Sequence, residues 1–190
     1  MLLAMLAPAH AETPDEASAL MKDYLDGEKL GGYVLLGAGI AGITTGTFFR
    51  TASCEVKQGM APPLLAVGAL HVAAGVYLHM ASDNRIRDFG AEIDRDGQDW
   101  VLRERERMDG VVTRLTVRQV VEAGLLAGGG ALVYYGYTRR RPKLQGVGLG
   151  LAIEAAFTLG FDLWIGQRAR GYRDDIRGLE IVTPRFSIMF

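Results

Sequence analysis

The sequence predicts an all-α membrane protein with four transmembrane helices arranged as two related hairpins. Four apolar runs, each nearly free of charge, are as long as the ~20 residues that a helix needs to cross a bilayer core. Glycine and alanine recur in them at every fourth position, which favours close packing of helices in lipid. The predicted spans are residues 30–49, 62–81, 119–137 and 146–166, so the hairpins cover residues 30–81 and 119–166.

Composition excludes several classes of protein. The net charge is −1 over 190 residues, so no basic excess indicates binding to nucleic acid. The single cysteine, Cys54, excludes an intrachain disulfide and a cysteine-based zinc site. No motif set in the chain identifies a known family.

The amino terminus resembles an exported one. Residues 1–11 form an apolar start that ends in Ala9-His10-Ala11, the small-x-small pattern of a signal-peptide cleavage site, although no Lys or Arg precedes Lys22. An apolar terminus without this role is the alternative. Residues 12–29 predict an extramembrane helix capped by Thr13, with Pro14 at its first position, ending at Gly27.

Small residues predict the faces on which the spans pack. They recur every four residues, as the spacing that brings helix backbones together in lipid requires. The predicted packing positions are Ala38, Gly42 and Gly46 in the first span, Ala123, Ala127 and Ala131 in the third, and Gly146 and Gly150 in the fourth.

Basic residues predict the orientation. Arg139, Arg140, Arg141 and Lys143 lie between the third and fourth spans, and such short basic links stay in the cytoplasm. We therefore expect a bacterial inner-membrane protein with its amino terminus, residues 82–118 and residues 167–190 on the periplasmic side. The link that holds Cys54 would then face the cytoplasm.

Shifted self-comparison predicts that the two hairpins are copies of each other. A shift of 90 residues aligns Gly39 with Gly129, and a shift of 83 aligns His71 with Glu154 and His79 with Asp162. A parallel internal repeat explains why the ionisable residues coincide. Convergent composition of membrane hairpins is the alternative.

Ionisable residues inside the predicted spans are the candidate site. They are costly in a bilayer, by about 2.5 to 3.5 kcal/mol on insertion scales, so they face protein, water or each other. His71 and Glu154 lie at matching depth, as do His79 and Asp162 nearer the outer surface. The candidate residues are His71, Glu154, His79, Asp162, Thr158 and Glu122.

Three interpretations of these residues remain open. They form buried polar clasps that fix helix register, a proton or cation path that uses histidine as the titrating group, or a metal site built on His79 and Asp162. We expect no cofactor, because transmembrane histidines occur in the second span alone and axial haem ligation from two helices would require a dimer.

Residues 82–118 predict an amphipathic helical link outside the membrane. Ile86, Phe89 and Ile93 have helical spacing. Glu92, Asp94, Asp96 and Gly97 copy the opening of an EF-hand loop, but Arg103 stands where the last calcium ligand belongs. A polar turn between two helices explains the same residues.

The last segment, residues 167–190, ends in an extended tail. Alternating apolar residues suit addition to the sheet edge of a partner. The predicted partner contacts are Trp100 in the link and Phe186, Ile188 and Phe190 in the tail. We expect membrane lipid and other protein subunits, or a second copy of the chain, as partners.

These observations predict a structural or accessory subunit of a bacterial membrane complex, and not an enzyme. The alternative is a small proton or cation transporter or channel that uses His71/Glu154 and His79/Asp162.

Overall fold

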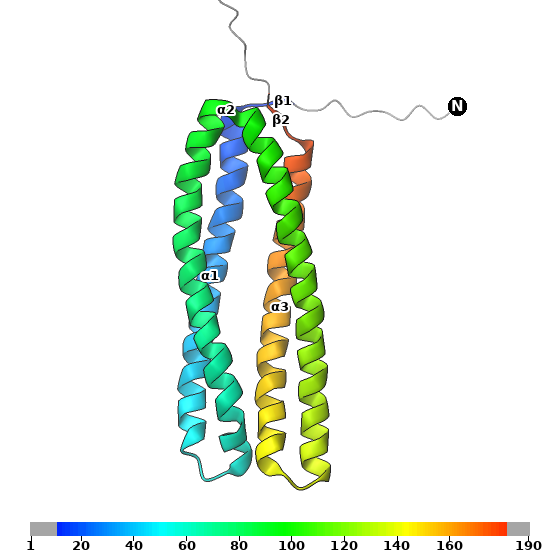
Figure 1. Ribbon diagram of the computed structural model, residues 1–190. Coiled ribbons are helices and arrows are strands. Elements are labelled where there is room, and N and C mark those ends of the chain that lie inside the picture. Colours follow the sequence, from blue (N-terminus) through cyan, green and yellow to red (C-terminus); the bar gives the residue numbers. More distant parts are fainter. Residues whose placement is uncertain (1–10, 182–190) are drawn as a thin grey trace, which may run out of the picture.

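A computed structural model describes residues 11–181, which form an elongated helical bundle (Figure 1). The helices are α1 (Pro14–Arg50), α2 (Glu55–Thr138) and α3 (Pro142–Gly178). Two short strands, β1 (Ala11–Glu12) and β2 (Glu180–Ile181), pair in parallel at one end. The described residues are therefore helical apart from these two strands and the short links.

The prediction of four transmembrane helices in two hairpins is wrong, because the structure has three helices. One helix, α2, runs through the predicted second span, the link and the predicted third span over 84 residues. Residues 82–118 contain no proline, and their apolar side chains repeat at helical spacing, so the helix continues past residue 81, where the second span was expected to end, as far as the turn at Asp96. The link is thus a continuation of the spans and not a separate element.

Asp96 reverses the direction of α2. Its φ of −156° and ψ of 82° are not helical, and its Oδ1 accepts a hydrogen bond of 3.1 Å from the Asp99 amide. Asp96 therefore acts as an N-cap for the helical residues after it. We call residues 55–95 the first arm of α2 and residues 97–138 its second arm. The predicted polar turn lies here, inside one long helix.

The amino-terminal helix begins as predicted but does not end as predicted. Thr13 and Glu16 form a capping box, with Pro14 at the first position. The helix then passes through Gly27 to Arg50, and the absence of a side chain at Gly27 leaves room for the Arg168 guanidinium of α3. Gly27 is thus a contact point between helices and not a terminator.

Glycines at seven-residue intervals hold α1 against the first arm of α2. A Cβ on Gly32 would meet the Gly75 carbonyl oxygen at 2.9 Å, and one on Gly39 would meet that of Gly68 at 2.6 Å. Gly46 faces Ala61 in the same way, at 3.2 Å. This spacing brings two antiparallel backbones into contact along a seam.

The second arm of α2 packs on α3 through a different face from the predicted one. Ala123, Ala127 and Ala131 are exposed, whereas Gly129 and Gly136 contact the α3 backbone. The spacing of small residues at every fourth position predicted the wrong side of this helix as the side that packs on α3.

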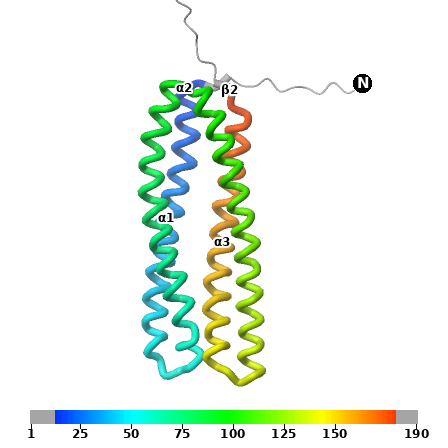
Figure 2. The backbone as a smooth tube through the Cα atoms, in the orientation of Figure 1, coloured from blue at the N-terminus to red at the C-terminus, as the bar shows by residue number. Residues whose placement is uncertain are grey.

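Gly146 and Gly150 of α3 join the two helix pairs at the end that carries the connecting links. Gly146 contacts Val56, and Gly150 contacts Met60 and Pro63, all in the first arm of α2. Figure 2 shows that the two links lie at this same end. We call this junction the closed end of the bundle.

The opposite half of the bundle has a conventional hydrophobic core. It is formed by α1, both arms of α2, and α3. Trp100, predicted to meet a partner, lies in this core with 1% of its surface exposed and its ring 6.4 Å from that of Phe89. Arg105 donates hydrogen bonds to the carbonyls of Ile176, Arg177 and Leu179, which caps the end of α3.

Each of the three helices is long and apolar enough to cross a membrane. Large apolar side chains such as Ile40, Leu70 and Val120 are exposed along them, as expected of a surface covered by lipid. The signal-like residues 1–10 and the tail residues Phe186, Ile188 and Phe190 lie outside the described residues.

The glycine seam makes a testable prediction. Gly39→Ala should lower the free energy of unfolding by about 1–3 kcal/mol, because the added Cβ would overlap the Gly68 carbonyl and the Val72 amide. Gly37→Ala is the matched control: nothing lies within 4 Å of its Cβ position, so it should be neutral or stabilise by about 0.5–1 kcal/mol. Thermal unfolding in detergent measures both, and equal midpoints would contradict the seam.

Candidate functional site

A cavity of about 700 Å³ lies between the two arms of α2, with α3 at its back and α1 at one side. Its walls are mostly apolar. Ten of the side chains that line it can hydrogen-bond or carry charge: Tyr24, Glu28, His71, Tyr77, Arg114, Arg118, Glu122, Glu154, Thr158 and Asp162. Five of these residues were predicted as the candidate site from the sequence.

The cavity stops before the closed end of the bundle. Its deepest lining residues are Val67 of the first arm and Leu151 of α3. Beyond them Gly150 and Gly146 bring α3 against the first arm without room for a Cβ. Access to the cavity therefore comes from between the arms of α2 and not from the link end.

His71 and Glu154 face each other deep in the cavity, as their depth predicted. Their side chains are nine-tenths buried, and His71 Nδ1 lies 3.7 Å from Glu154 Oε2. The other nitrogen, Nε2, lies 3.2 Å from Thr158 Oγ1. The Glu154 carboxyl also lies beside Gly42, so it reaches toward α1. The pair thus joins all three helices.

The hydrogen bonds of Thr158 assign the histidine tautomer. The Thr158 hydroxyl donates its single proton to the Glu154 backbone carbonyl at 2.8 Å, so it accepts from His71 Nε2–H. Nδ1, which has no hydrogen-bond partner among the described residues, then points at the Glu154 carboxyl. A proton on Nδ1 or on the carboxyl would make this 3.7 Å approach attractive. The geometry therefore suits a pair that shares a single proton.

Asp162 and Glu122 form a second acidic cluster with Arg118. Arg118 contacts Asp162 at 3.0 Å and 3.1 Å and approaches Glu122 at 3.8 Å. Gln119 donates to the Asp162 backbone carbonyl at 2.9 Å. The two buried carboxyls share one half-exposed guanidinium, so the cluster cannot be neutral when both carboxyls are ionised.

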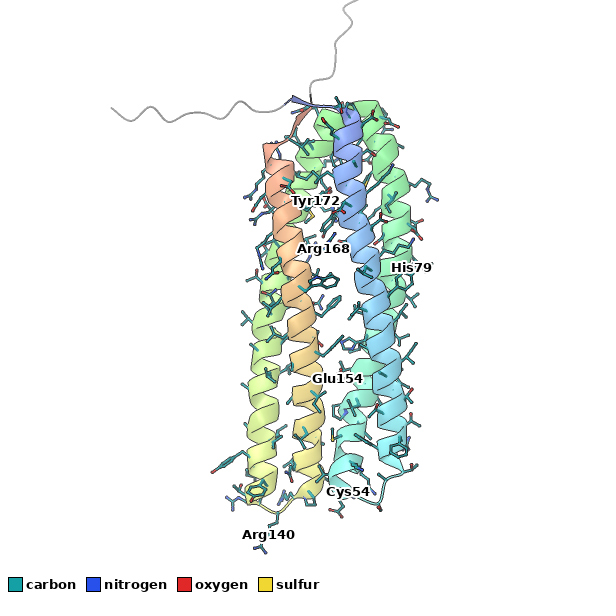
Figure 3. The ribbon with its side chains drawn as sticks, turned by 180° about the vertical axis from the view of Figure 1, so that it is seen from behind. Cys54, His79, Arg140, Glu154, Arg168 and Tyr172 are labelled. Atoms are coloured by element: carbon teal, nitrogen blue, oxygen red, sulfur yellow. The ribbon has the colours of Figure 1, made fainter. Side chains whose placement is uncertain are left out.

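The predicted pairing of His79 with Asp162 is not formed. His79 lies near Asp83, at 4.0 Å, and its ring lies 5.0 Å from that of Tyr33 on α1. Eight residues advance a helix by about 800°, which is about 80° past two full turns. The first arm and α3 run in the same direction, so this rotation turns His79 toward α1 and Asp162 toward the second arm (Figures 1 and 3).

The two ligands of the predicted metal site, His79 and Asp162, therefore do not lie close together. No group of three or more His, Cys, Asp or Glu side chains in the described part of the chain lies close enough together to hold a metal ion. Two of the EF-hand-like residues have other contacts, since Glu92 pairs with Arg103 and Asp96 caps the second arm of α2.

Arg118 was missed in the sequence because it lies at the boundary between the charged link and the third apolar run. Its spacing of four residues from Glu122 is the signal that could have found it, because residues at i and i+4 share a helix face. Its contact with Asp162 comes from a distant part of the chain and required the fold.

A second polar network closes the far side of the cavity, outside the apolar segments. Arg107 holds Glu104 with two hydrogen bonds of 2.6 Å, and the Tyr172 hydroxyl donates to Glu104 at 3.0 Å. The Tyr172 ring stacks on that of Tyr24 at 4.2 Å, and Tyr24 donates to Glu28. The network ties α1, α2 and α3 together above the cavity.

Burial shifts the pKa values in this network. Desolvation, with the nearby charge of Glu28, raises the pKa of Tyr24 well above its ordinary value, and desolvation with Glu104 raises that of Tyr172. Burial alone would lower the pKa of Arg107, but its hydrogen bonds and charge interaction with Glu104 raise it. The phenols therefore stay neutral and Arg107 stays charged across the physiological range.

Comparison with protein-family models, with curated proteins and with solved structures finds no match for this chain. The site must therefore be interpreted from its own chemistry.

The tyrosine shifts predict alkaline instability of the outer half. A phenol whose pKa is raised on folding adds stability that is fully present below the ordinary value of 10.0 and is lost as the pH rises above it. The thermal midpoint should thus fall above pH 10 in the wild type and fall less in Tyr172→Phe. Tyr137→Phe, at an exposed position, is the control and should follow the wild type. Identical pH profiles for Tyr172→Phe and the wild type would contradict the burial of this phenol.

Proposed function

We propose that this protein is a small membrane transporter that moves protons, or a cation in exchange for them, through the cavity between the arms of α2. The observation that carries the proposal is that His71, Glu154, Glu122 and Asp162 all line one cavity. A clasp alone would satisfy these groups against each other. Here His71 Nδ1 and Glu122 Oε2 have no hydrogen-bond partner in the described chain, while Asp162 Oδ2 lies 3.0 Å from the Arg118 guanidinium.

Charge balance supports proton movement. The buried carboxyls of Glu122, Glu154 and Asp162 lie around Arg118, and ions in an apolar interior are costly unless they are balanced. Protons or an external cation must supply the remaining positive charge. Proton transport requires at least one group in the cavity that binds and releases a proton. Histidine is the side chain suited to this role near neutral pH, and His71 lines the cavity.

The closed end favours a transporter over an open channel. Access from one side, with backbone contacts at Gly146 and Gly150 on the other, corresponds to one state of an alternating-access cycle. Separation of α3 from the first arm at this junction would open the second side. On the α3 side this contact is made by Gly146 and Gly150, which have no side chains to interlock with the first arm.

The orientation remains part of the proposal. Cys54 and Arg140 lie at the same end of the bundle (Figure 3), so both links face one side of any membrane the protein crosses. The basic residues of the second link support placing this end in the cytoplasm of a bacterial inner membrane. The cavity would then face the periplasmic side.

The accessory-subunit role stays an untested prediction. Its proposed contact Trp100 is buried, and the tail residues lie outside the described part of the chain. No catalytic role is proposed.

The transport proposal predicts the behaviour of a double variant. His71→Asn combined with Glu154→Gln keeps the shape and polarity of both side chains but removes the proton that they hold. Proton uptake into vesicles containing this variant, followed with a pH-sensitive dye trapped inside under an imposed membrane potential, should fall to the level of protein-free vesicles.

Glu106→Gln is the control, because Glu106 is exposed and lies outside the cavity. It should conduct as the wild type does. Wild-type rates in the double variant would contradict the proposal and leave the clasp as the role of the pair.

A further inference from the structure

The mouth of the cavity is apolar and lies between the two arms of α2. Leu70 and Tyr77 of the first arm and Val121 of the second line the cavity, yet 67%, 64% and 56% of their surfaces are exposed. Leu70 and Val121 belong to apolar segments long enough to cross a membrane, so a bilayer would cover this mouth with lipid tails. A ligand that uses this entrance must be soluble in hydrocarbon.

The interior selects for positive charge. Charged and titratable groups face the cavity from every surrounding element: Tyr24 and Glu28 from α1, His71 and Tyr77 from the first arm, Arg114, Arg118 and Glu122 from the second arm, and Glu154 and Asp162 from α3. Arg85 pairs with Glu28 at 2.9 Å, so three carboxyls remain for two arginines. Both arginines are exposed on the outer side, whereas Glu154 lies deep beside His71. The deep part of the cavity therefore becomes negative once the proton shared by His71 and Glu154 leaves.

Buried polar atoms without partners point to a missing ligand. Glu122 Oε2 accepts no hydrogen bond in the described chain, and His71 Nδ1 beside Glu154 has no partner either, although both residues are more than nine-tenths buried. Such groups are costly when unsatisfied. A cation in the cavity would stabilise the ionised carboxyls of Glu122 and Glu154, which are not paired as closely as Asp162 is with Arg118.

Aromatic rings complete the binding surface. Phe161 and Tyr77 line the cavity, and the Phe157 ring lies against His71 with 5.4 Å between the centroids. Ring faces attract organic cations, and more strongly where water is excluded. A volume of about 700 Å³ suits a drug-sized molecule, since such sites hold about 300–1,000 Å³.

We propose that the cavity binds a lipophilic organic cation that enters from the membrane between the arms of α2 and displaces the proton held by His71 and Glu154. This inference rests on the transport function proposed above and names its substrate. On binding, the O–H bond of the Glu154 carboxyl breaks, the proton leaves to water, and the carboxylate remains to balance the ligand. Release of the cation restores the proton, so the two are exchanged.

An anionic or neutral amphiphile fits the site less well. An anion would meet the Glu154 carboxyl at the deep end. A neutral ligand would leave the carboxyls of Glu122 and Asp162 as they are, with a single guanidinium between them. Charge complementarity thus favours a cation, and the apolar mouth requires that its charge be shielded by hydrocarbon or aromatic groups.

Two ions of the same shape test this inference on the full chain in a neutral detergent. Tetraphenylphosphonium and tetraphenylborate have nearly equal apolar surfaces and opposite charge. Equilibrium dialysis, corrected for protein-free micelles, should show saturable binding of the phosphonium and none of the borate. Its affinity should rise with pH by up to about tenfold per unit, since one proton leaves on binding.

Variants locate the binding. Glu154→Gln should weaken phosphonium binding by at least about tenfold and abolish its pH dependence, whereas Glu106→Gln should bind as the wild type does. If Glu154→Gln does not fold, the comparison of the two ions and the pH dependence in the wild type still decide the question.

Equal binding of both ions, or phosphonium binding that is independent of pH, would overturn the inference. Proton uptake in vesicles without any organic cation is measured separately. If it depends on His71 and Glu154 while the phosphonium does not bind, the substrate assignment fails and the transport proposal stands. If proton uptake does not depend on His71 and Glu154 and the phosphonium does not bind, both the transport proposal and the substrate assignment fail.

Discussion

Buried charge without enough opposite charge is the constraint on which the rest of the structure depends. Glu122, Glu154 and Asp162 lie in a bundle whose apolar surface suits lipid, and Arg118 is the arginine that contacts this group. Ions in such surroundings are tolerated when protons, counter-ions or water compensate them. The cavity supplies space for that compensation, and the tautomer of His71 leaves one nitrogen facing Glu154. The cavity, the proton shared by His71 and Glu154, and the excess of buried carboxyls therefore occur at the same site.

The frame around the cavity explains why the helices do not collapse into it. At one end, Gly146 and Gly150 bring α3 against the first arm of α2. At the other, Glu104 joins Arg107 and Tyr172 in a buried network. Each end fixes the spacing of the helices, while the glycine seam keeps α1 against the first arm. Between the two fixed ends the arms of α2 remain apart, which leaves the mouth open toward lipid.

The sequence correctly predicted how far along the helices His71 and Glu154 lie, but it did not predict on which side of a helix other residues lie. It placed His71 opposite Glu154, and the structure brings them together, because both lie near the middle of apolar runs of similar length. It could not show that His79 and Asp162 turn apart, since this follows from the parallel course of two helices. Counting small residues likewise found Gly146 but chose Ala123 wrongly. The number of helices was wrong because no break in the pattern separates the apolar runs from the link. The turn at Asp96 is made by one residue with non-helical φ and ψ, between two helical arms.

Water access to the deep part of the cavity is the central claim, and thiol labelling measures it directly. Thr158→Cys in a Cys54→Ser background places the sole cysteine beside His71, while Ile153→Cys in the same background places it on the exposed apolar face of α3. In lipid vesicles, a small membrane-impermeant thiol reagent should modify the cysteine at position 158 and leave the one at 153 unmodified. Equal protection of both positions would show that the paired ionisable groups lie in a dry core, and would contradict this account.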